Sequence, residues 1–499
     1  MAAATKKAGG AAAAETTEAG GLLDQMLSAM PSNVQQDEAK DIVGALVQEV
    51  MSGQTTVDSS VVKTIRQAIA GIDKRVSKQL SAVMHHPEFA KLEGSWRGLH
   101  HLVMNSQTSK QLRLKVLNVK KTELKKDLDK AVDFDASKLF KDIYDAEFGM
   151  PGGSPYSALI GDYEFSNHPE DVDLLRKVSG VAAAAHCPFI SGVSPQMFGM
   201  DSFADLQKPL DIEKLVSGKK HTAWNAFRDT DDARYVSLVM PRTLARMPYG
   251  KNTKPVEEFN YEELPYDYES GESLEAEHND FCWMNAAYAY GAVLTRAFNN
   301  TGWCTAIRGR ENGGTVDNLP VYNFQSDDGE VASKCPTEIA ITGRRENELS
   351  KQGFIPLCHY KDTDFSVFFG AQTCQKPKKY DQAEATDNAA ISARLPYIMA
   401  ASRIAHYLKC IAVDKIGSFM EREDCEDWLN TWIKQYVNAR SDADAEMKAK
   451  FPLAEAEIRV TDVPGQPGVY NATALLRPWL QLEELHTAVS MVAKIPARG

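Results

Sequence analysis

Short strand-like runs alternate with helical runs through the middle of the chain, from about residue 88 to residue 375. Strands separated by helices favour a sheet with helices packed against it, so the alternation predicts an α/β fold with a mixed sheet. Gly, Pro and Asn concentrate between the runs, in three segments that we interpret as loops: residues 149–155, 248–255 and 309–320.

Four segments of this region predict strands. Residues 111–119 (QLRLKVLNV) alternate apolar and polar side chains in the manner of a half-buried strand. The other three strand predictions lie further along the chain, at residues 156–165, 233–240 and 354–360.

The N-terminal part of the chain predicts a flexible arm with short amphipathic helices. Residues 1–21 are rich in Ala and Gly and hold few side chains that could offset the entropy lost on ordering, so we expect disorder there. The apolar residues that follow share one stripe of a short helix, which Pro31 ends. They are Leu22, Leu23, Met26 and Leu27. A second amphipathic segment spans residues 42–50.

A longer helix with one narrow apolar seam comes next. Its apolar residues recur three or four positions apart: Val62, Ile65, Ile69, Ile72, Val76, Leu80 and Val83. Asp58, Ser59 and Ser60 are candidate N-terminal caps, and Pro87 stops the helix. So narrow a seam fits docking onto another helix. The pattern leaves open whether the helix docks onto a partner or onto the chain's own core.

The C-terminal part predicts a separate domain. A polar stretch at residues 372–387 indicates a boundary, and helices are predicted at residues 389–413 and 421–440. Two strands, at residues 456–463 and 469–476, flank the turn Pro464-Gly465-Gln466-Pro467-Gly468. The apolar run at 480–495 fits a helix or a strand. We therefore divide the chain into residues 1–57, 58–375 and 376–499.

Composition excludes several classes of function. The net charge is 56 − 68 = −12, whereas a mainly electrostatic nucleic-acid binder needs a basic surface. No stretch approaches the ~20 consecutive apolar residues of a membrane span, and the N-terminus lacks the apolar segment of a signal peptide. We expect a cytoplasmic protein with no nucleic-acid partner and no membrane insertion.

Signals of catalysis are weak. The chain has no GxGxxG, GxxxxGK[ST], HExxH or GxSxG motif. The loop at residues 309–314 could cradle an anion or be a plain surface turn. His85-His86 and His100-His101, with Glu88 and Glu93 between them, could supply metal ligands or be ordinary histidines. We expect no metal and no cofactor.

The eight cysteines form no CxxC pair, and most have apolar neighbours, which favours buried structural thiols. A rival hypothesis is a cytoplasmic α/β enzyme in which one cysteine works with His186, His221 or His359. That hypothesis predicts a thiol of lowered pKa. Without a nucleophile, metal or phosphate signature, we do not expect an enzyme.

One segment is specific enough to indicate a family. Residues 86–103 read HPEFAKLEGSWRGLHHLV, which resembles the signature of the large sheath subunit of bacterial type VI secretion systems, the TssC/VipB family. Further segments resemble the same family in the same order: GDYEF (161–165), PFISGVSPQMFG (188–199), DARYVSLVMPRTLARMPYG (232–250), 302–320, 353–357, LPYIMAASRIAHY (395–407) and LNTWIKQYV (429–437). The resemblance covers roughly residues 58 to 495.

This resemblance implies a phage-tail-sheath-like fold and a structural role in the bacterial cytoplasm. The large subunit would pair with a small sheath subunit (TssB/VipA) and polymerise with copies of itself into a helical tube around an inner tube of Hcp rings. Contraction would propel the inner tube, with baseplate components as further partners. The AAA+ unfoldase ClpV would then dismantle the sheath through an N-terminal helix. A related phage-type sheath, without that helix, is a further alternative.

The resemblance also suggests where partners bind. The stripe of Leu22, Leu23, Met26 and Leu27 is the candidate unfoldase-binding helix, unless it packs on its own subunit or on the partner. The C-terminal hairpin is the candidate for strand exchange between subunits, unless it pairs wholly within its own domain. Its candidate residues are Ile458, Val460, Val469 and Tyr470. The acidic run at 421–427 could face the inner tube or be a solvated helix start.

Overall fold

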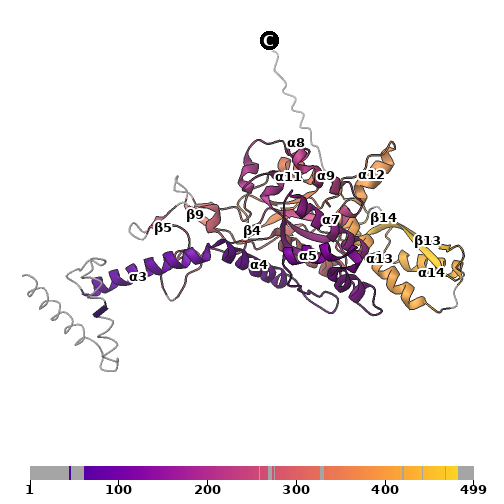
Figure 1. The fold of residues 1–499 in the computed structure, drawn as a ribbon, viewed down its shortest axis with the longest axis horizontal. Helices are drawn as coiled ribbons and strands as arrows, with labels where there is room; N and C mark the ends of the chain where they lie inside the picture. Colours follow the sequence, from indigo (N-terminus) through magenta and orange to yellow (C-terminus); the bar gives the residue numbers. More distant parts are fainter. Residues whose placement is uncertain are drawn as a thin grey trace, which may run out of the picture. The chain divides into compact units, whose positions relative to one another are not determined.

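A computed structural model describes residues 44–45, 61–257, 259–267, 272–274, 276–325, 331–418, 421–440, 442–466 and 468–481 (Figure 1). Its contacts divide the chain into two compact units. The first unit holds the described residues of Met1–His86 and Pro248–Asp280. The second holds those of Pro87–Met247 and Phe281–Gly499. The sequence-based boundaries at 57/58 and 375/376 stay predictions.

A six-stranded mixed sheet organises the second unit, in the order β1-β2-β3-β11-β12-β8. Four neighbouring strands are parallel: β1 (Leu159–Phe165), β2 (Phe189–Val193), β3 (Val236–Met240) and β11 (Phe354–His359). Two antiparallel strands complete it: β12 (Ser366–Phe368) and β8 (Thr315–Val316). The predicted α/β fold with a mixed sheet is confirmed, as are three of the four strand predictions.

Helices cover both faces of this sheet, which explains why β2 and β3 are buried along their whole length. One face packs against α7 (Pro169–Ala184) and α9 (Thr222–Arg228), where the Trp224 ring stacks on Phe354 with centroids 5.5 Å apart. The other face packs against α10 (Ala286–Thr301), which is buried along most of its length.

Shorter elements connect these layers. The helices are α4 (Pro87–Met104), α5 (Lys121–Lys130), α6 (Lys138–Phe140), α8 (Ile212–Val216) and α11 (Gly343–Lys351). A π-helix, η2, spans Lys141–Phe148, and 3-10 turns are η1 (Phe134–Ala136), η3 (Pro195–Phe198), η4 (Phe203–Gln207), η5 (Lys219–His221) and η6 (Asp232–Tyr235). The 3-10 turn η7 (His278–Asp280) belongs to the first unit. Small two-stranded sheets pair β4 (Thr243–Leu244) with β7 (Trp283–Met284), and β9 (Asn323–Gln325) with β10 (Val331–Ser333).

The C-terminal part of the second unit has its own apolar cluster. It joins α13 (Leu395–Lys415) and α14 (Arg422–Lys434) to a hairpin of β13 (Leu453–Asp462) and β14 (Tyr470–Pro478). Before them lies α12 (Ala383–Ser392), and α15 (Ala445–Lys450) precedes the hairpin. The predicted strand-turn-strand is confirmed.

Two predictions within the second unit differ from the structure. Residues 111–119 pair with no strand among the described residues. The prediction that they form a strand of a sheet within the described chain is therefore wrong. Residues 389–413 form two helices rather than one. The break falls at Ala393 and Arg394, because Pro396 has no N–H to donate to the preceding turn and is tolerated only in the first turn of a helix, which here is the first turn of α13.

In the first unit, α3 (Val61–Met84) confirms the predicted long helix. The loop at 248–280, with β5 (Tyr266–Asp267) and β6 (Glu272–Ser273), packs against its C-terminal half. Ser81 Oγ lies 3.2 Å from the Tyr261 hydroxyl, and Tyr249 donates its N–H to Glu263 at 2.7 Å. Among the described residues, no helix combines the length and the apolar character that crossing a membrane requires.

Candidate assembly surfaces

The histidines proposed as metal ligands or catalytic bases have structural contacts. His85 lies 3.6 Å from Glu263 and 3.7 Å from Asp280. Of the three in the rival enzyme hypothesis, His186 meets the Tyr235 hydroxyl at 3.1 Å and His221 meets the Met197 carbonyl at 2.7 Å. Within the described ranges, no group of three or more His, Cys, Asp and Glu side chains is arranged to hold a metal.

Seven of the eight thiols have a raised pKa, whereas the rival enzyme hypothesis predicts a lowered one. Burial raises the pKa of Cys282, Cys304 and Cys374 to about 12. Burial also raises the pKa values of Cys187, Cys335, Cys358 and Cys425. A nucleophilic cysteine needs a lowered pKa, so these seven thiols do not have the character of nucleophiles. Cys187, Cys282, Cys358 and Cys374 are buried, as expected of structural thiols.

The glycine-rich loop at residues 309–314 uses its amides internally. Gly309 donates its N–H to the Phe368 carbonyl at 2.7 Å, and Gly314 donates to the Gly309 carbonyl at 2.8 Å. Gly313 has a φ of +81°, and a side chain there would lie 2.5 Å from the Ala306 carbonyl oxygen. The glycines therefore serve a tight turn beside β12, and these two amides are not available to an anion.

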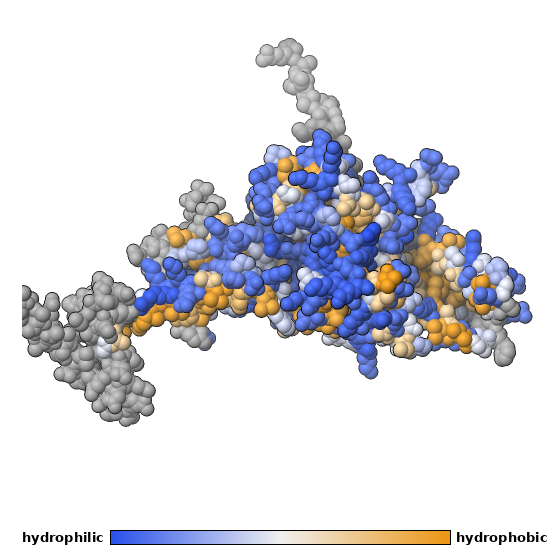
Figure 2. Space-filling view, in the orientation of Figure 1, coloured by the Kyte–Doolittle hydropathy of each residue, from blue (hydrophilic) through white to orange (hydrophobic). Residues whose placement is uncertain are grey.

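The apolar seam of α3 is exposed. Val62 is 58% exposed and Ile69 is 52% exposed. Among the α3 side chains whose burial is described, the buried ones are Ala68 and Ser77, outside the seam. Figure 2 shows the apolar side chains as a stripe along this helix. Among the described residues the chain's own core does not cover the seam, so the α3 seam is a surface suited to a partner helix.

A second seam lies on α4, and the sequence analysis missed it. Its members recur at spacings of three and four: Phe89, Leu92, Trp96, Leu99 and Val103. Trp96 is 64% exposed and Leu92 is 55% exposed. The same 3-4 spacing identified the α3 seam, but residues 86–103 were interpreted only as a family signature. We call these five residues the α4 seam.

Glycines on the opposite face of α4 fix this helix to the second unit. A side chain at Gly94 would lie 2.2 Å from the Trp283 carbonyl oxygen, and one at Gly98 would lie 2.3 Å from the Tyr288 ring. Beside them, Arg246 binds both oxygens of Glu93, at 2.6 and 3.1 Å. Burial raises the pKa of Glu93, but Arg246 and the neighbouring arginine on α4 outweigh it and lower this pKa below its ordinary value. Gly94 and Gly98 thus face inwards and the α4 seam faces outwards.

The C-terminal hairpin has one covered edge and one open edge. The Asn430 side chain of α14 accepts the N–H of Ile458 on β13 at 2.9 Å and donates to the Ile458 carbonyl at 2.7 Å. Glu426 accepts the Val460 N–H at 2.8 Å. The polar backbone groups of Ile458 and Val460 thus face α14. Because Ala472 and Ala474 lie directly opposite them, their own backbone groups face away from β13.

The predicted strand residues therefore have two different environments. Ile458 and Val460 are buried against α14, whereas Val469 is 44% exposed and Tyr470 is half-buried. Within the described chain, β14 pairs only with β13, which leaves its outer edge open. The predicted unfoldase-binding residues Leu22, Leu23, Met26 and Leu27 lie outside the described residues.

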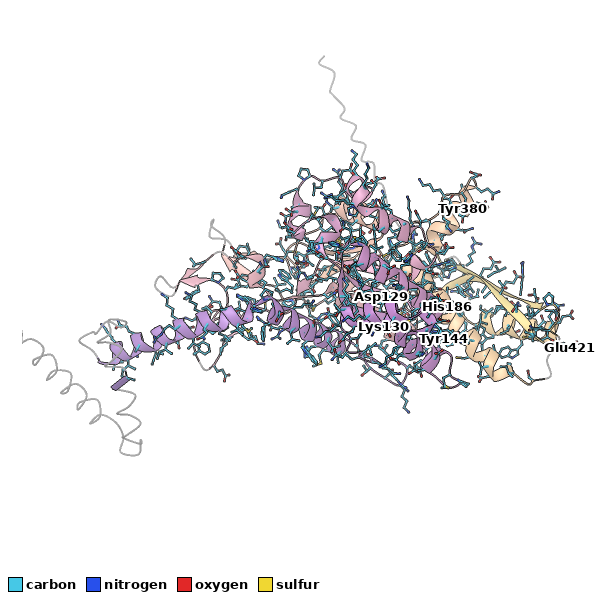
Figure 3. All side chains as sticks on the ribbon, viewed as in Figure 1. Asp129, Lys130, Tyr144, His186, Tyr380 and Glu421 are labelled. Carbon is cyan, nitrogen blue, oxygen red and sulfur yellow. The ribbon has the colours of Figure 1, made fainter. Side chains whose placement is uncertain are left out.

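The acidic run at the start of α14 is partly structural. Glu426 accepts the Val460 N–H, and Arg422 contacts both Glu423, at 2.9 Å, and Asp462, at 3.7 Å. The Glu423 side chain is nonetheless 83% exposed, and Glu421, labelled in Figure 3, directly precedes the helix. A helix start stabilised by its dipole and a surface for a basic partner remain compatible with this arrangement.

Comparisons with known proteins decide the family. The VipB family model, an EvpB-type tail sheath N-terminal domain, matches residues 66–375. The VipB_2 model, an EvpB-type tail sheath gpW/gp25-like domain, matches residues 384–495. This chain belongs to the VipB family of tail sheath proteins. The resemblance drawn from the sequence motifs is confirmed.

A close relative of this VipB family member has a described role. The chain is 44% identical over 485 residues to the type VI secretion system sheath protein TssC1 of Pseudomonas aeruginosa. The alignment covers 97% of this chain and 96% of that protein. The protein is thus a member of a structural sheath family.

Two solved structures show weaker likeness to this VipB family chain. The baseplate of the anti-feeding prophage matches with a TM-score of 0.33 and 11% identity, over 64% of this chain and 66% of that one. The contracted helical sheath of the same particle matches with a TM-score of 0.28 and 11% identity, over 63% and 66%. At these scores the likeness adds nothing to the family assignment.

Proposed function

We propose that this protein is the large subunit of a contractile type VI secretion sheath. The observation that carries the proposal is its 44% identity to the sheath protein TssC1 across 97% of the chain. In this proposal the chain pairs with a small sheath subunit (TssB/VipA), and the pairs polymerise into a helical tube that contracts. The predicted division into an arm, a middle sheath domain and a C-terminal assembly domain at residues 57/58 and 375/376 is part of it.

The exposed seams support a heteromeric pairing. Both the α3 seam and the α4 seam present apolar side chains at 3-4 spacing, the pattern that packs against a partner helix. Isolated exposed apolar residues need no explanation, but continuous stripes mark interaction surfaces. The small subunit is the partner to which we assign these seams.

The hairpin supports the proposed contact between successive copies in the tube. A helical polymer needs head-to-tail contacts that do not close into a ring, and an open strand edge can supply one through backbone hydrogen bonds. The candidate residues of the hairpin remain Ile458, Val460, Val469 and Tyr470. In this proposal the outer edge of β14 pairs with a strand of the next copy in the tube. That edge can be tested by proline substitution.

Ala472→Pro removes an outward-facing N–H and should abolish tubes while leaving soluble heterodimers. Ala456→Pro on β13 is the matched control. The backbone N–H of Ala456 points away from β14, towards the covered side of the hairpin, so its loss leaves the outer edge of β14 unchanged. Normal tubes from Ala472→Pro would contradict strand addition at this edge.

The remaining partners follow from the proposed sheath. The inner tube of Hcp rings would meet the acidic start of α14, and the tube would end on baseplate components in the bacterial cytoplasm. The unfoldase ClpV would engage the helix of Leu22, Leu23, Met26 and Leu27 after contraction. Deletion of residues 1–31 should then abolish ClpV binding to contracted sheaths. Undiminished binding would contradict this assignment.

The decisive experiment is co-expression with the small-subunit gene product. High-speed pelleting of the lysate, followed by negative-stain electron microscopy of the pellet, should show hollow, cross-striated tubes. Expression without the small subunit should give poorly soluble protein or large aggregates instead. Discrete small particles that remain in the supernatant when both proteins are present would contradict the proposed function.

A further inference from the structure

The segment that leads from α4 to α5 is extended but joins no sheet among the described residues. Residues 112–120 run without a helix, turn or bend, and their apolar-polar alternation is that of a strand. Among the described residues, they join no sheet. Their backbone hydrogen bonds within that part of the chain lie at the ends, where Ser109 contacts Leu112 and the Tyr163 hydroxyl donates to the Val119 carbonyl at 2.8 Å.

Side chains hold this segment in place. The Ser109 hydroxyl accepts the Leu112 N–H at 3.1 Å, which fixes its start. In its middle, the Lys115 ammonium pairs with the Glu147 carboxylate and lies 5.0 Å from the centre of the Tyr156 ring. The segment is therefore ordered before any partner binds. Pairing with a strand would cost it less conformational entropy than the same pairing would cost a flexible loop.

Its apolar side chains are only partly covered. Leu112 and Leu114 are half-buried, but Val116 is 69% exposed and Leu117 is 59% exposed. A branched or apolar residue at the centre of a strand normally packs against neighbours on the sheet surface. The uncovered middle is where a neighbouring strand would supply that contact.

The charge of the segment defines the chemistry of its neighbour. Residues 106–122 carry five basic side chains and no acidic one, in a chain whose net charge is −12. Lys115 and Lys121 each pair with a carboxylate elsewhere in the chain, whereas the other three form no ion pair with a carboxylate among the described residues. Arg113 and Lys120 are exposed. Opposite charges on directly paired strand residues stabilise a sheet, and like charges destabilise it. A matching strand therefore alternates acidic and apolar residues.

We propose that residues 112–119 receive an edge strand of a second, different polypeptide, with acidic and apolar residues in alternation. The identification of that polypeptide with the small sheath subunit rests on the proposed function. Backbone hydrogen bonds along the segment supply affinity, and its basic side chains select the acidic strand.

Strands of a second copy of this chain fit poorly. The open strand β14 carries Arg477 and no acidic residue, so its charge is of the wrong sign. On β1, which does carry Asp162 and Glu164, side chains already donate to the carbonyls of Gly161, Tyr163 and Glu164. A different polypeptide is therefore the committed occupant.

Proline substitutions test the proposal through their periodicity. Alternate N–H groups of a strand point to opposite edges, so a partner strand on one edge uses the N–H groups of either residues 114 and 116 or residues 113 and 117. We would co-express full-length Leu114→Pro, Val116→Pro, Arg113→Pro and Leu117→Pro with the small subunit and measure its co-purified amount. One pair should lose binding by roughly tenfold, and the other should stay within about twofold of its reference. The reference is the wild type for three variants, and for Arg113→Pro it is Arg113→Ala, which lacks the charge but keeps the N–H.

Controls separate the outcomes. In the soluble fraction of the chain made alone, each variant should show the wild-type thermal unfolding curve, because no ladder among the described residues includes this segment. Amide hydrogen exchange at residues 113–118 should slow by about tenfold or more in the complex. Four variants that all bind like the wild type, or unchanged exchange, would overturn the inference and leave the function intact.

Two further results concern the partner. If the wild-type chain itself fails to bind the small subunit, the proposed function fails instead. If the proline pattern appears in self-association without any small subunit, the occupant is a second copy and the proposal of a different polypeptide is overturned. An Arg113→Glu variant should weaken binding while leaving every backbone N–H in place.

Discussion

Two long helices of this protein carry apolar stripes and use them in opposite ways. On α10, Asn285 caps the start by accepting the Ala287 N–H at 2.9 Å, Gly302 closes the end with a φ of +78°, and most residues between them are buried in the sheet core. On α3, the seam stays exposed, with Val62 at 58% and Ile69 at 52%. Both helices repeat their apolar residues at helical spacing. They therefore differ in what covers the stripe: the sheet of the same chain covers α10, whereas the α3 seam is left for a partner.

This contrast shows how an assembly subunit distributes its apolar surface. Burial of α10 stabilises the chain by itself, at roughly 25 cal/mol per Å² of apolar area removed from water. The α3 seam removes little area from water in the single chain, so its contribution appears only on association. Changes of the same chemistry in the two regions should therefore have different effects.

The largest expected difference comes from one truncation made in two places. Ile190→Ala, at a fully buried position of β2, should lower the free energy of unfolding by about 2–5 kcal/mol. Ile69→Ala, on the α3 seam, should lower it by less than about 1 kcal/mol but reduce co-purification with the small subunit. Urea denaturation followed by tryptophan fluorescence measures the first effect. Equal losses of stability would contradict the contrast.

Two helical glycines sharpen the comparison. Gly94→Ala places a methyl group 2.2 Å from the backbone oxygen of Trp283 and should destabilise the chain by about 1–3 kcal/mol. Gly71→Ala on α3 meets nothing within 4 Å and should stabilise it by about 0.5–1 kcal/mol, since alanine favours the helix. Thermal unfolding of both variants gives the signs. A stable Gly94→Ala would mean that α4 can move away from β7.

The covered edge of β13 can be opened. Asn430→Ala leaves the N–H and the carbonyl of Ile458 without their partner and should cost about 1–3 kcal/mol. Asn299→Ala, which loses one exposed bond to the Gln107 carbonyl at 3.2 Å, is the matched control and should cost under about 0.5 kcal/mol. The difference between the two midpoints of urea denaturation tests this role of α14.

The smallest expected effect depends on pH, at the junction between α7 and α13. Burial lowers the pKa values of His186 and His406, and the nearby Lys409 lowers that of His186 further. The ring of His186, labelled in Figure 3, has its centroid 6.4 Å from that of His406, and His406 Nε2 donates to the Ala185 carbonyl at 2.9 Å. The folded state therefore favours the neutral rings.

A lowered folded pKa fixes the direction of this dependence. The unfolded chain binds these protons first, so stability is complete above the ordinary pKa of about 6.5 and falls as the pH drops below it. The slope is at most about 1.4 kcal/mol per pH unit for each histidine. Unfolding measured at pH 7.5 and 5.5 should show a smaller loss in His406→Gln than in His100→Gln, which changes an exposed ring. Equal losses would exclude this junction as the source.

Periodicity predicted the elements that depend on their own sequence. The β-strands at Val236–Met240 and Phe354–His359 are continuous apolar runs, and α3 repeats its apolar residues at helical spacing. The break before α13 was missed, although Pro396 was visible, because helix-forming residues surround it on both sides. The α4 seam was missed as well. Apolar residues three and four positions apart predict a helix with an apolar face, but they do not indicate whether the fold buries that face.

The sequence by itself determined the family, the α/β class and the apolar stripes, since motif order and periodicity are local properties of the chain. Only the tertiary structure decided which stripes remain exposed, that residues 112–120 have no neighbouring strand within the described part of the chain, and that Asn430 and Glu426 cover one edge of the hairpin. Those outcomes depend on contacts between residues far apart in the chain. The spacing of residues along the sequence does not indicate which distant residues will pack against an apolar face or hydrogen-bond to a strand edge.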